Sequence, residues 1–75
     1  MNDRLRNIMS SIFDIPIEEI NEQTSVENCV QWDSFQHMSL LVAIEEEFGL
    51  TLNDDEVLGM KDFTSIIDIL ESYNR

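Results

Sequence analysis

The sequence predicts an all-α protein with three main helices, a short helix before the last of them and a long loop after the first. Apolar residues recur at helical spacing in three segments, which begin near residues 2, 34 and 65. No segment alternates apolar and polar residues for long enough to indicate a strand. The 75 residues can bury one small core, so we expect a single domain over residues 1–75.

The first predicted helix runs from Asn2 to about Asp14, and a long loop follows it. Pro16 ends this helix, because proline disfavours a helical residue before it and lacks the N–H donor that a continuing helix needs. From Pro16 to Asp33 there is no sustained periodicity, only a possible single turn flanked by Ile17 and Ile20. A connection of this length is unusual in a compact domain and is often functional. The apolar stripe of the helix consists of Leu5, Ile8, Met9, Ile12 and Phe13.

The second predicted helix begins at Asp33 or Ser34 and ends at Gly49. Either residue can cap it, and Gln36 follows Asp33 by three positions, as in a capping box. Gly49 closes the helix after Phe48.

The last two predicted helices are shorter. Residues 53–60 form at most a short third helix, which starts at Asn53 or Asp54 and stops near Gly59. The segment Ser65-Ile66-Ile67-Asp68 has the pattern of a capping box. We therefore expect the final helix to run from Ser65 to Tyr73.

The second helix carries two apolar stripes. When successive residues are placed about 100° apart around the helix, one set of apolar residues forms an ordinary core face, and His37 falls among them. That set is Leu40, Leu41, Ile44 and Phe48. The other set, which we call the second stripe, lies beside Ser34 and consists of Phe35, Met38 and Val42. A three-helix core leaves the second stripe partly exposed, as at a docking site, unless the loop over residues 15–32 folds across it. The pattern leaves both possibilities open.

The chain is strongly acidic, with 16 Asp and Glu against 4 Lys and Arg and a formal net charge of −12. Its cations are scattered at Arg4, Arg6, Lys61 and Arg75, whereas phosphate binding needs clustered basic residues. The composition therefore argues against nucleic acid and anionic membranes as partners. It favours a partner with a basic face.

The chain has one cysteine, Cys29, and no cluster of histidine and cysteine with metal-ligand spacing, so we expect neither an internal disulfide nor a metal site. The longest apolar run covers residues 40–44, far short of a signal-peptide core or a membrane span. We therefore expect a cytoplasmic protein that does not insert into membranes and is, by default, a monomer.

Ser34 stands where the second helix begins, and this position gives its hydroxyl a special environment. Free backbone N–H groups and the positive end of the helix dipole favour an anion there, so a phosphoryl group attached to this hydroxyl would be stabilised. The simpler interpretation is that Asp33 or Ser34 does no more than cap the helix.

Several segments, in this order, resemble the acyl carrier proteins, including the related carrier domains of polyketide and peptide synthases. They are Asp33-Ser34-Phe35, a helix ending Ala43-Ile44-Glu45-Glu46-Glu47-Phe48-Gly49, an acidic Asn53-Asp54-Asp55-Glu56 turn and a final capped helix. The resemblance spans nearly the whole chain and implies a four-helix bundle with a short third helix. It also implies that Ser34, preceded by Asp33, receives a 4′-phosphopantetheine arm from coenzyme A through a phosphopantetheinyl transferase. Cargo would ride on this arm as a thioester, presented to acyl-loading, condensing or acyl-transfer enzymes, and the chain itself would not be an enzyme.

The residues around the serine depart from the family pattern at several positions. Phe35 replaces the usual leucine, and Gln36 and Ser39 stand where fatty-acid carriers are often acidic. With Trp32 and His37, these departures are more similar to specialised stand-alone carriers of secondary or cell-surface pathways. The partner contacts that the resemblance implies are Phe35, Met38, Val42, Glu45, Glu46 and Glu47.

Catalysis and calcium binding have weaker support in the sequence than a carrier function. His37 falls on the core face, so we interpret it as a packed residue and not as a base, and Cys29 has no basic neighbour to activate its thiol. Residues 53–56 lack the ligand spacing and the glycine of an EF-hand loop. Two alternatives stay open: an aminoacyl or peptidyl carrier of the same fold, and an unmodified acidic helical adaptor that binds partners through the second stripe.

Overall fold

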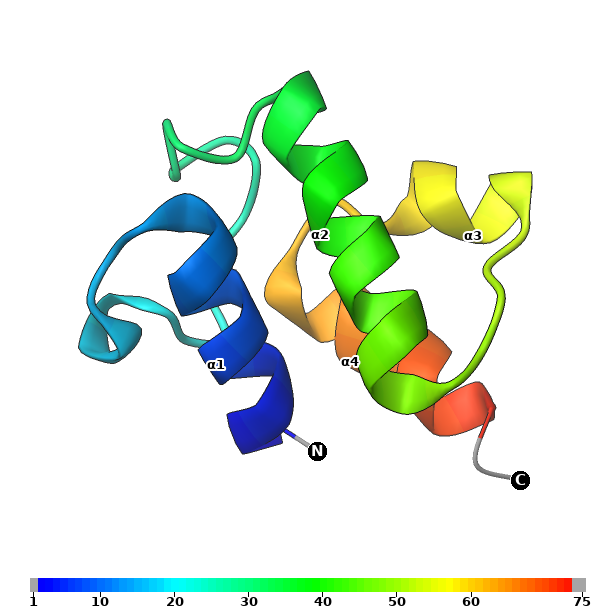
Figure 1. The fold of residues 1–75 in the computed structure, drawn as a ribbon. Helices are drawn as coiled ribbons and strands as arrows, with labels where there is room; N and C mark the ends of the chain where they lie inside the picture. Colours follow the sequence, from blue (N-terminus) through cyan, green and yellow to red (C-terminus); the bar gives the residue numbers. More distant parts are fainter. Residues whose placement is uncertain (1, 74–75) are drawn as a thin grey trace.

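The computed structural model describes residues 2–73, and all regular structure within this range is helical, as predicted (Figure 1). The elements are α1 (Asn2–Phe13), a 3₁₀ turn η1 (Ile17–Glu19), α2 (Ser34–Phe48), α3 (Asp54–Gly59) and α4 (Phe63–Ser72). None of the helices described has the length and hydropathy of a membrane span. Arg75, one of the four cations, lies outside the described residues.

The three long helices pack around one core. Figure 1 shows α1 and α2 side by side and running in opposite directions, with α4 passing behind α2 and α3 to the right of α2. The first apolar stripe of α2 faces this core, as its spacing predicts. The helices bury Leu5, Met9, Phe13, Leu40, Leu41, Ile44, Phe63, Ile66 and Leu70, and the connections add Ile20, Cys29, Trp32, Leu52 and Met60.

The ends of α1 and α2 lie close to where the local sequence predicts them. Asp14 adopts a left-handed conformation, with φ of 56°, and stops α1 at Phe13, one residue earlier than expected. Asp33 is the N-cap of α2, and Gly49 ends this helix in the same left-handed region, with φ of 65°.

The start of α4 differs from the prediction. Asp62 is the N-cap, and its Oδ1 accepts a hydrogen bond from the N–H of Ser65 at 2.8 Å. The prediction that Ser65 begins this helix is therefore wrong, since Ser65 lies within the first turn. Packing explains the difference, because a helix that starts at Phe63 places this ring, only 2% exposed, in the core. The helix ends at Ser72, with Tyr73 as its C-cap.

The loop between α1 and α2 is fastened to the connection between α3 and α4. The N–H of Val26 donates to the carbonyl of Lys61 at 3.0 Å. The N–H of Phe63 donates to the carbonyl of Thr24 at 2.9 Å. The expected single turn near residue 17 is present as η1. These bonds place the loop against the start of α4 and away from the outer side of α2.

Candidate functional site

Ser34 is the first residue of α2 and is exposed at the open end of this helix. The residue before it performs the capping, since the Asp33 carboxylate accepts a hydrogen bond from the N–H of Gln36 at 2.8 Å. Capping therefore does not occupy the Ser34 hydroxyl. The first N–H groups of a helix have no partner within it, so this end of α2 favours a negatively charged group.

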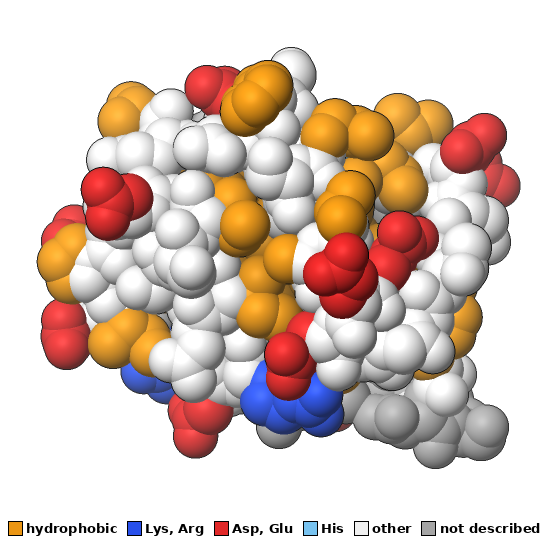
Figure 2. Space-filling model, in the orientation of Figure 1, with side chains coloured by type: hydrophobic (Ala, Val, Ile, Leu, Met, Phe, Trp, Pro, Cys, Tyr) orange, Lys and Arg blue, Asp and Glu red, His pale blue; other side chains and the backbone are white. Residues whose placement is uncertain are grey.

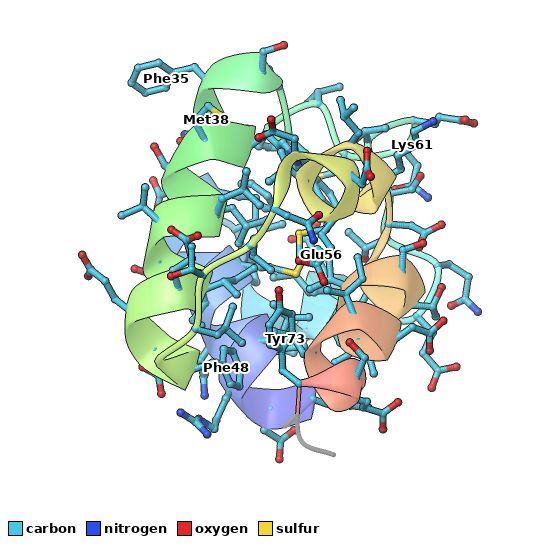
Figure 3. The ribbon with its side chains drawn as sticks, turned by 90° about the vertical axis from the view of Figure 1, so that its right-hand side faces the viewer. Phe35, Met38, Phe48, Glu56, Lys61 and Tyr73 are labelled. Atoms are coloured by element: carbon cyan, nitrogen blue, oxygen red, sulfur yellow. The ribbon has the colours of Figure 1, made fainter. Side chains whose placement is uncertain are left out.

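An open groove of about 610 Å³ lies beside Ser34, between the amino end of α2 and α3. Met38 of α2 lines one side, and Val57 and Leu58 of α3 line the other. Figure 3 shows α3 next to the upper part of α2, with Lys61 just beyond it. The groove is thus largely apolar and lies within reach of the Ser34 hydroxyl at its rim.

The second stripe of α2 is exposed to solvent. Phe35 is 79% exposed, Met38 59% and Val42 52%, and Figure 3 shows the first two projecting outward from the upper end of α2. The possibility that the loop over residues 15–32 buries the second stripe is wrong, because that loop packs against the start of α4. An exposed apolar cluster of this kind is typical of a binding surface.

Three further apolar side chains are exposed near the amino end of α2, and the sequence analysis missed all of them. Leu58 of α3 lies across the groove from Met38, Val26 lines the same groove, and Val30 lies in the loop before α2. None belongs to a helical stripe, so periodicity could not single them out. The one available signal was an apolar residue in an otherwise polar segment.

Comparison with known proteins identifies the family. The sequence model of the family described as "Phosphopantetheine attachment site" matches residues 3–71, which is nearly the whole chain. The chain belongs to the acyl carrier protein family. It is 28% identical over 68 residues to the acyl carrier protein of Coprothermobacter proteolyticus, covering 91% of this chain and 83% of that protein. It is also 28% identical over 72 residues to the acyl carrier protein of Buchnera aphidicola subsp. Schizaphis graminum, covering 96% and 91%.

A solved structure confirms the predicted fold of this carrier. An acyl carrier protein from Enterococcus faecalis superimposes with a TM-score of 0.74 over 95% of this chain and 90% of that chain, at 22% sequence identity. The family makes the chain a carrier and not an enzyme, with phosphopantetheine as its prosthetic group. Such carriers work with partner enzymes, including the transferase that attaches this group.

The residues at the amino end of α2 fit a phosphopantetheine arm. The arm is long and flexible, with a phosphate at the attached end, so it needs an accessible hydroxyl in a site that accepts negative charge. Ser34 has both, because it is exposed and stands at the positive end of α2. The groove offers apolar surface to the part of the arm beyond the phosphate.

The three glutamates at the carboxyl end of α2 differ in their surroundings. Glu45 is half-buried, and its Oε2 accepts a hydrogen bond from the N–H of Leu52 at 2.8 Å. Glu47 forms an ion pair with Arg4 at 3.0 Å. Glu46 is exposed, and Figure 2 shows acidic side chains spread over this face with basic ones only at its lower edge. Two of the three carboxylates thus have roles within the fold itself.

His37 is packed, as predicted, and both of its ring nitrogens are engaged. Nδ1 accepts a hydrogen bond from Nε1 of Trp32 at 3.0 Å, and Nε2 lies 3.3 Å from the carbonyl oxygen of Val57. The ring is therefore not available to Ser34 as a base. Cys29 is 8% exposed and buried, in agreement with an inert thiol.

The acidic segment at residues 53–56 serves as a helix start. The Asn53 side chain accepts from the N–H of Glu56 at 2.8 Å, and the Glu56 carboxylate accepts from the N–H of Asn53 at 3.0 Å. This is a complete capping box for α3. Between residues 2 and 73 no group of three or more His, Cys, Asp or Glu side chains is arranged to hold a metal ion.

Proposed function

We propose that Ser34 carries a 4′-phosphopantetheine arm through a phosphodiester bond, and that the protein transports acyl groups as thioesters of this arm. The observation that carries the proposal is the free, exposed Ser34 hydroxyl at the first position of α2, with Asp33 as the cap. When bound, the arm supplies a terminal thiol, whose thioester is activated for acyl transfer and for condensation.

Each part of the site has a role in this function. The amino end of α2 stabilises the negative charge of the phosphodiester, because the first N–H groups and the helix dipole face it. The apolar groove between Ser34 and α3 holds the inner part of the arm or the start of an acyl chain. His37, whose two ring nitrogens contact Trp32 and Val57, does not act on Ser34, and a transferase of the kind that serves this family performs the attachment.

The second stripe is the proposed contact surface for partner enzymes. Phe35 and Met38 project from the turns that follow Ser34, so an enzyme that reaches the arm also covers them. Gln36 and Ser39 leave this part of α2 without acidic side chains, and the charge that attracts basic partners lies further along, at Glu46. This arrangement supports a partner with an apolar pocket near the arm, and a specialised acyl pathway in preference to general fatty-acid synthesis.

The test is intact mass spectrometry after incubation with coenzyme A, Mg²⁺ and a broad-specificity phosphopantetheinyl transferase. We expect the wild type to gain the mass of one phosphopantetheine group. Ser34→Ala should gain nothing, whereas Ser39→Ala, a matched serine on the same helix, should be modified like the wild type. If several transferases leave the wild type unmodified, or modify Ser34→Ala equally, the proposal is wrong.

The exposed second stripe also supports a second candidate, an unmodified adaptor that binds partners through Phe35, Met38 and Val42. Ser34→Asn separates the two, because asparagine keeps a polar side chain at the helix start but has no hydroxyl to esterify. An adaptor would retain partner binding and biological function with this substitution, whereas a carrier would lose all function. Loading assays with acyl and aminoacyl substrates would then distinguish an acyl carrier from an aminoacyl or peptidyl carrier.

A further inference from the structure

His37 forms a bridge between the chain segment that enters α2 and the helix across the groove. Its Nδ1 is 3.0 Å from Nε1 of Trp32, and its Nε2 is 3.3 Å from the carbonyl oxygen of Val57. Indole nitrogen can only donate, so Nδ1 must be the acceptor. The ring proton is then on Nε2, which donates to Val57. One neutral tautomer therefore satisfies both contacts.

The contact at Val57 matters because few others hold α3, chiefly the packing of Val57 against the core and the bond from Tyr73 to Glu56. This helix contains six residues, none of them buried, and a helix this short is not stable alone in water. The carbonyl of Val57 lies near the end of α3, where carbonyl groups lack partners within the helix. His37 supplies a donor at this point, in addition to the N–H of Met60. The side of the groove formed by α3 thus depends on a side chain of α2.

The contact at Trp32 holds the chain segment that precedes Ser34. Trp32 is 3% exposed, stands two residues before Ser34 and packs against Phe13 of α1, with ring centroids 5.4 Å apart. Its bond to His37 joins the segment that leads into Ser34 to the first turn of α2. The same imidazole therefore positions both Ser34 and the α3 wall that faces it.

We infer that His37 is a positioning residue of the Ser34 site, which in its neutral form joins Trp32 to α3 and which releases Trp32 on protonation. This inference relies on the proposed function only for the role of Ser34. A protonated ring carries hydrogen on both nitrogens, so Nδ1 would face the indole N–H as a second donor, while Nε2 could still donate to Val57. Protonation of His37 would thus break its bond to Trp32, in the segment before Ser34, and keep its bond to Val57 of α3.

Several charged groups lie near the His37 ring. Asp33, before α2, and Lys61, after α3, line the same groove and have opposite charges. On α3, Asp54 and Asp55 are exposed in the first turn, and Glu56 is bonded to Asn53 and Tyr73. Those bonds hold the pKa of Glu56 below its ordinary value, so it stays ionised at mildly acidic pH.

The test is hydrogen exchange by NMR, followed at the indole N–H of Trp32, the only tryptophan, and at the backbone amides of α3. Three proteins are compared at about pH 7.5 and 5.5. His37→Phe keeps a ring without polar atoms, whereas His37→Gln keeps one acceptor and one donor but cannot titrate. Rates are corrected for the intrinsic effect of pH, and amides of α1 serve as the reference within each protein.

We expect acid to speed exchange of the wild-type indole by about fivefold, the effect of losing one hydrogen bond, with the α3 amides little changed. His37→Phe should show faster exchange at both reporters and at both pH values. His37→Gln should resemble the neutral wild type throughout. Equal indole exchange in the wild type at both pH values overturns the inference, and this measurement decides it even if a variant does not fold. The mass assay is run in parallel, since failure to modify Ser34 refutes the carrier function without affecting the exchange result.

Discussion

The Tyr73 hydroxyl donates a hydrogen bond to the Glu56 carboxylate, so the residue that follows α4 is joined to the capping box of α3 (Figure 3). The same hydroxyl lies 3.0 Å from the carbonyl oxygen of Thr51. Because α3 buries none of its own residues, contacts of this kind determine where it sits. Together with His37 at the other end, Tyr73 fixes α3 beside the groove.

We predict that Tyr73→Phe lowers the urea midpoint of unfolding at neutral pH by a small amount and speeds exchange of the α3 amides. The substitution removes one hydroxyl and leaves the aromatic ring, so the effect reports the hydrogen bonds alone. Chemical denaturation and amide exchange measure the two effects. Equal exchange of α3 in both proteins would show that Tyr73 does not hold this helix.

The stabilisation by Tyr73 should depend on pH at both extremes. The bond from the N–H of Asn53 and then that from Tyr73 lower the pKa of Glu56 from 4.5, so its stabilising effect is present above the unfolded value and is lost as pH falls. The bond to Glu56 raises the pKa of Tyr73 above 10.0, so this contribution is lost as pH rises through the folded value. Urea titrations of wild type and Tyr73→Phe should therefore differ most near neutral pH and converge in acid and in strong base.

The N-cap of α4 allows a test of where this helix begins. The structure has Asp62 as the cap, whereas the sequence pattern predicted a start at Ser65. We expect Asp62→Ala to lower the free energy of unfolding by about 1 kcal/mol, as loss of a cap does. Asp68→Ala, which removes the acidic residue of the predicted capping box, should change it by less than about 0.5 kcal/mol, because Asp68 is exposed. Urea denaturation at pH 7 compares them, and a larger effect at Asp68 would contradict the structure.

The Asp62 cap should also weaken in acid. Hydrogen bonds from the side chain and then the backbone of Ser65 hold the pKa of Asp62 below its ordinary value of 3.8. A carboxylate with a lowered folded pKa stabilises the protein above its unfolded pKa and loses this effect as pH falls. The difference between wild type and Asp62→Ala should therefore shrink below about pH 4, which urea titrations at a series of pH values would measure.

Local sequence predicted those features that depend on neighbouring residues. Gly49 ends α2 and Asn53 starts α3 because each acts on residues within one turn. The start of α4 escaped prediction because the pattern at Ser65 is locally as good as the cap at Asp62, and only burial of Phe63 decides between them. Long-range contacts escaped for a related reason. Periodicity could place His37 on the inner face of α2, but not opposite Val57, which is 20 residues away in the chain.

Arg4 connects the start of α1 to the end of α2. Its guanidinium donates to the side chain of Glu47 at 3.0 Å and to the carbonyl of Glu47 at 2.7 Å, and it lies 4.5 Å from the centre of the Phe48 ring. We predict that Arg4→Met destabilises the protein by about 1 kcal/mol at low salt, because an exposed ion pair and a cation–π contact are lost. Arg6→Met is the matched control, since Arg6 pairs only with Asp3 of its own helix, at 3.6 Å, among the described residues.

The Arg4 effect should be partly electrostatic. Both substitutions remove one positive charge from an acidic chain, so the difference between them excludes general repulsion. Raising the salt from about 0.01 M to about 1 M should reduce this difference, because the screening length falls from about 30 Å to about 3 Å. Urea denaturation at the two salt concentrations measures the change, and a difference that grows with salt would contradict this account.

The second stripe gives a prediction about partner recognition that is separate from stability. Phe35 is 79% exposed, so Phe35→Ser should change the free energy of unfolding by less than about 0.5 kcal/mol. By contrast, Leu40→Ala should lower the free energy of unfolding by about 3 kcal/mol, because Leu40 is fully buried on the core side of the same helix. We expect Phe35→Ser to lower kcat/KM for modification by the transferase about tenfold, as loss of an aromatic anchor does in a protein interface.

Val30→Ser is the control for this prediction, because Val30 is 89% exposed and apolar but lies outside the second stripe. If recognition needs the side chains that follow Ser34 on α2, this variant is modified like the wild type. A reduction equal to that of Phe35→Ser would indicate that exposed apolar area in general, and not the second stripe, attracts the enzyme. Because neither substitution alters the core, a lower rate with unchanged unfolding assigns the loss to docking at the amino end of α2.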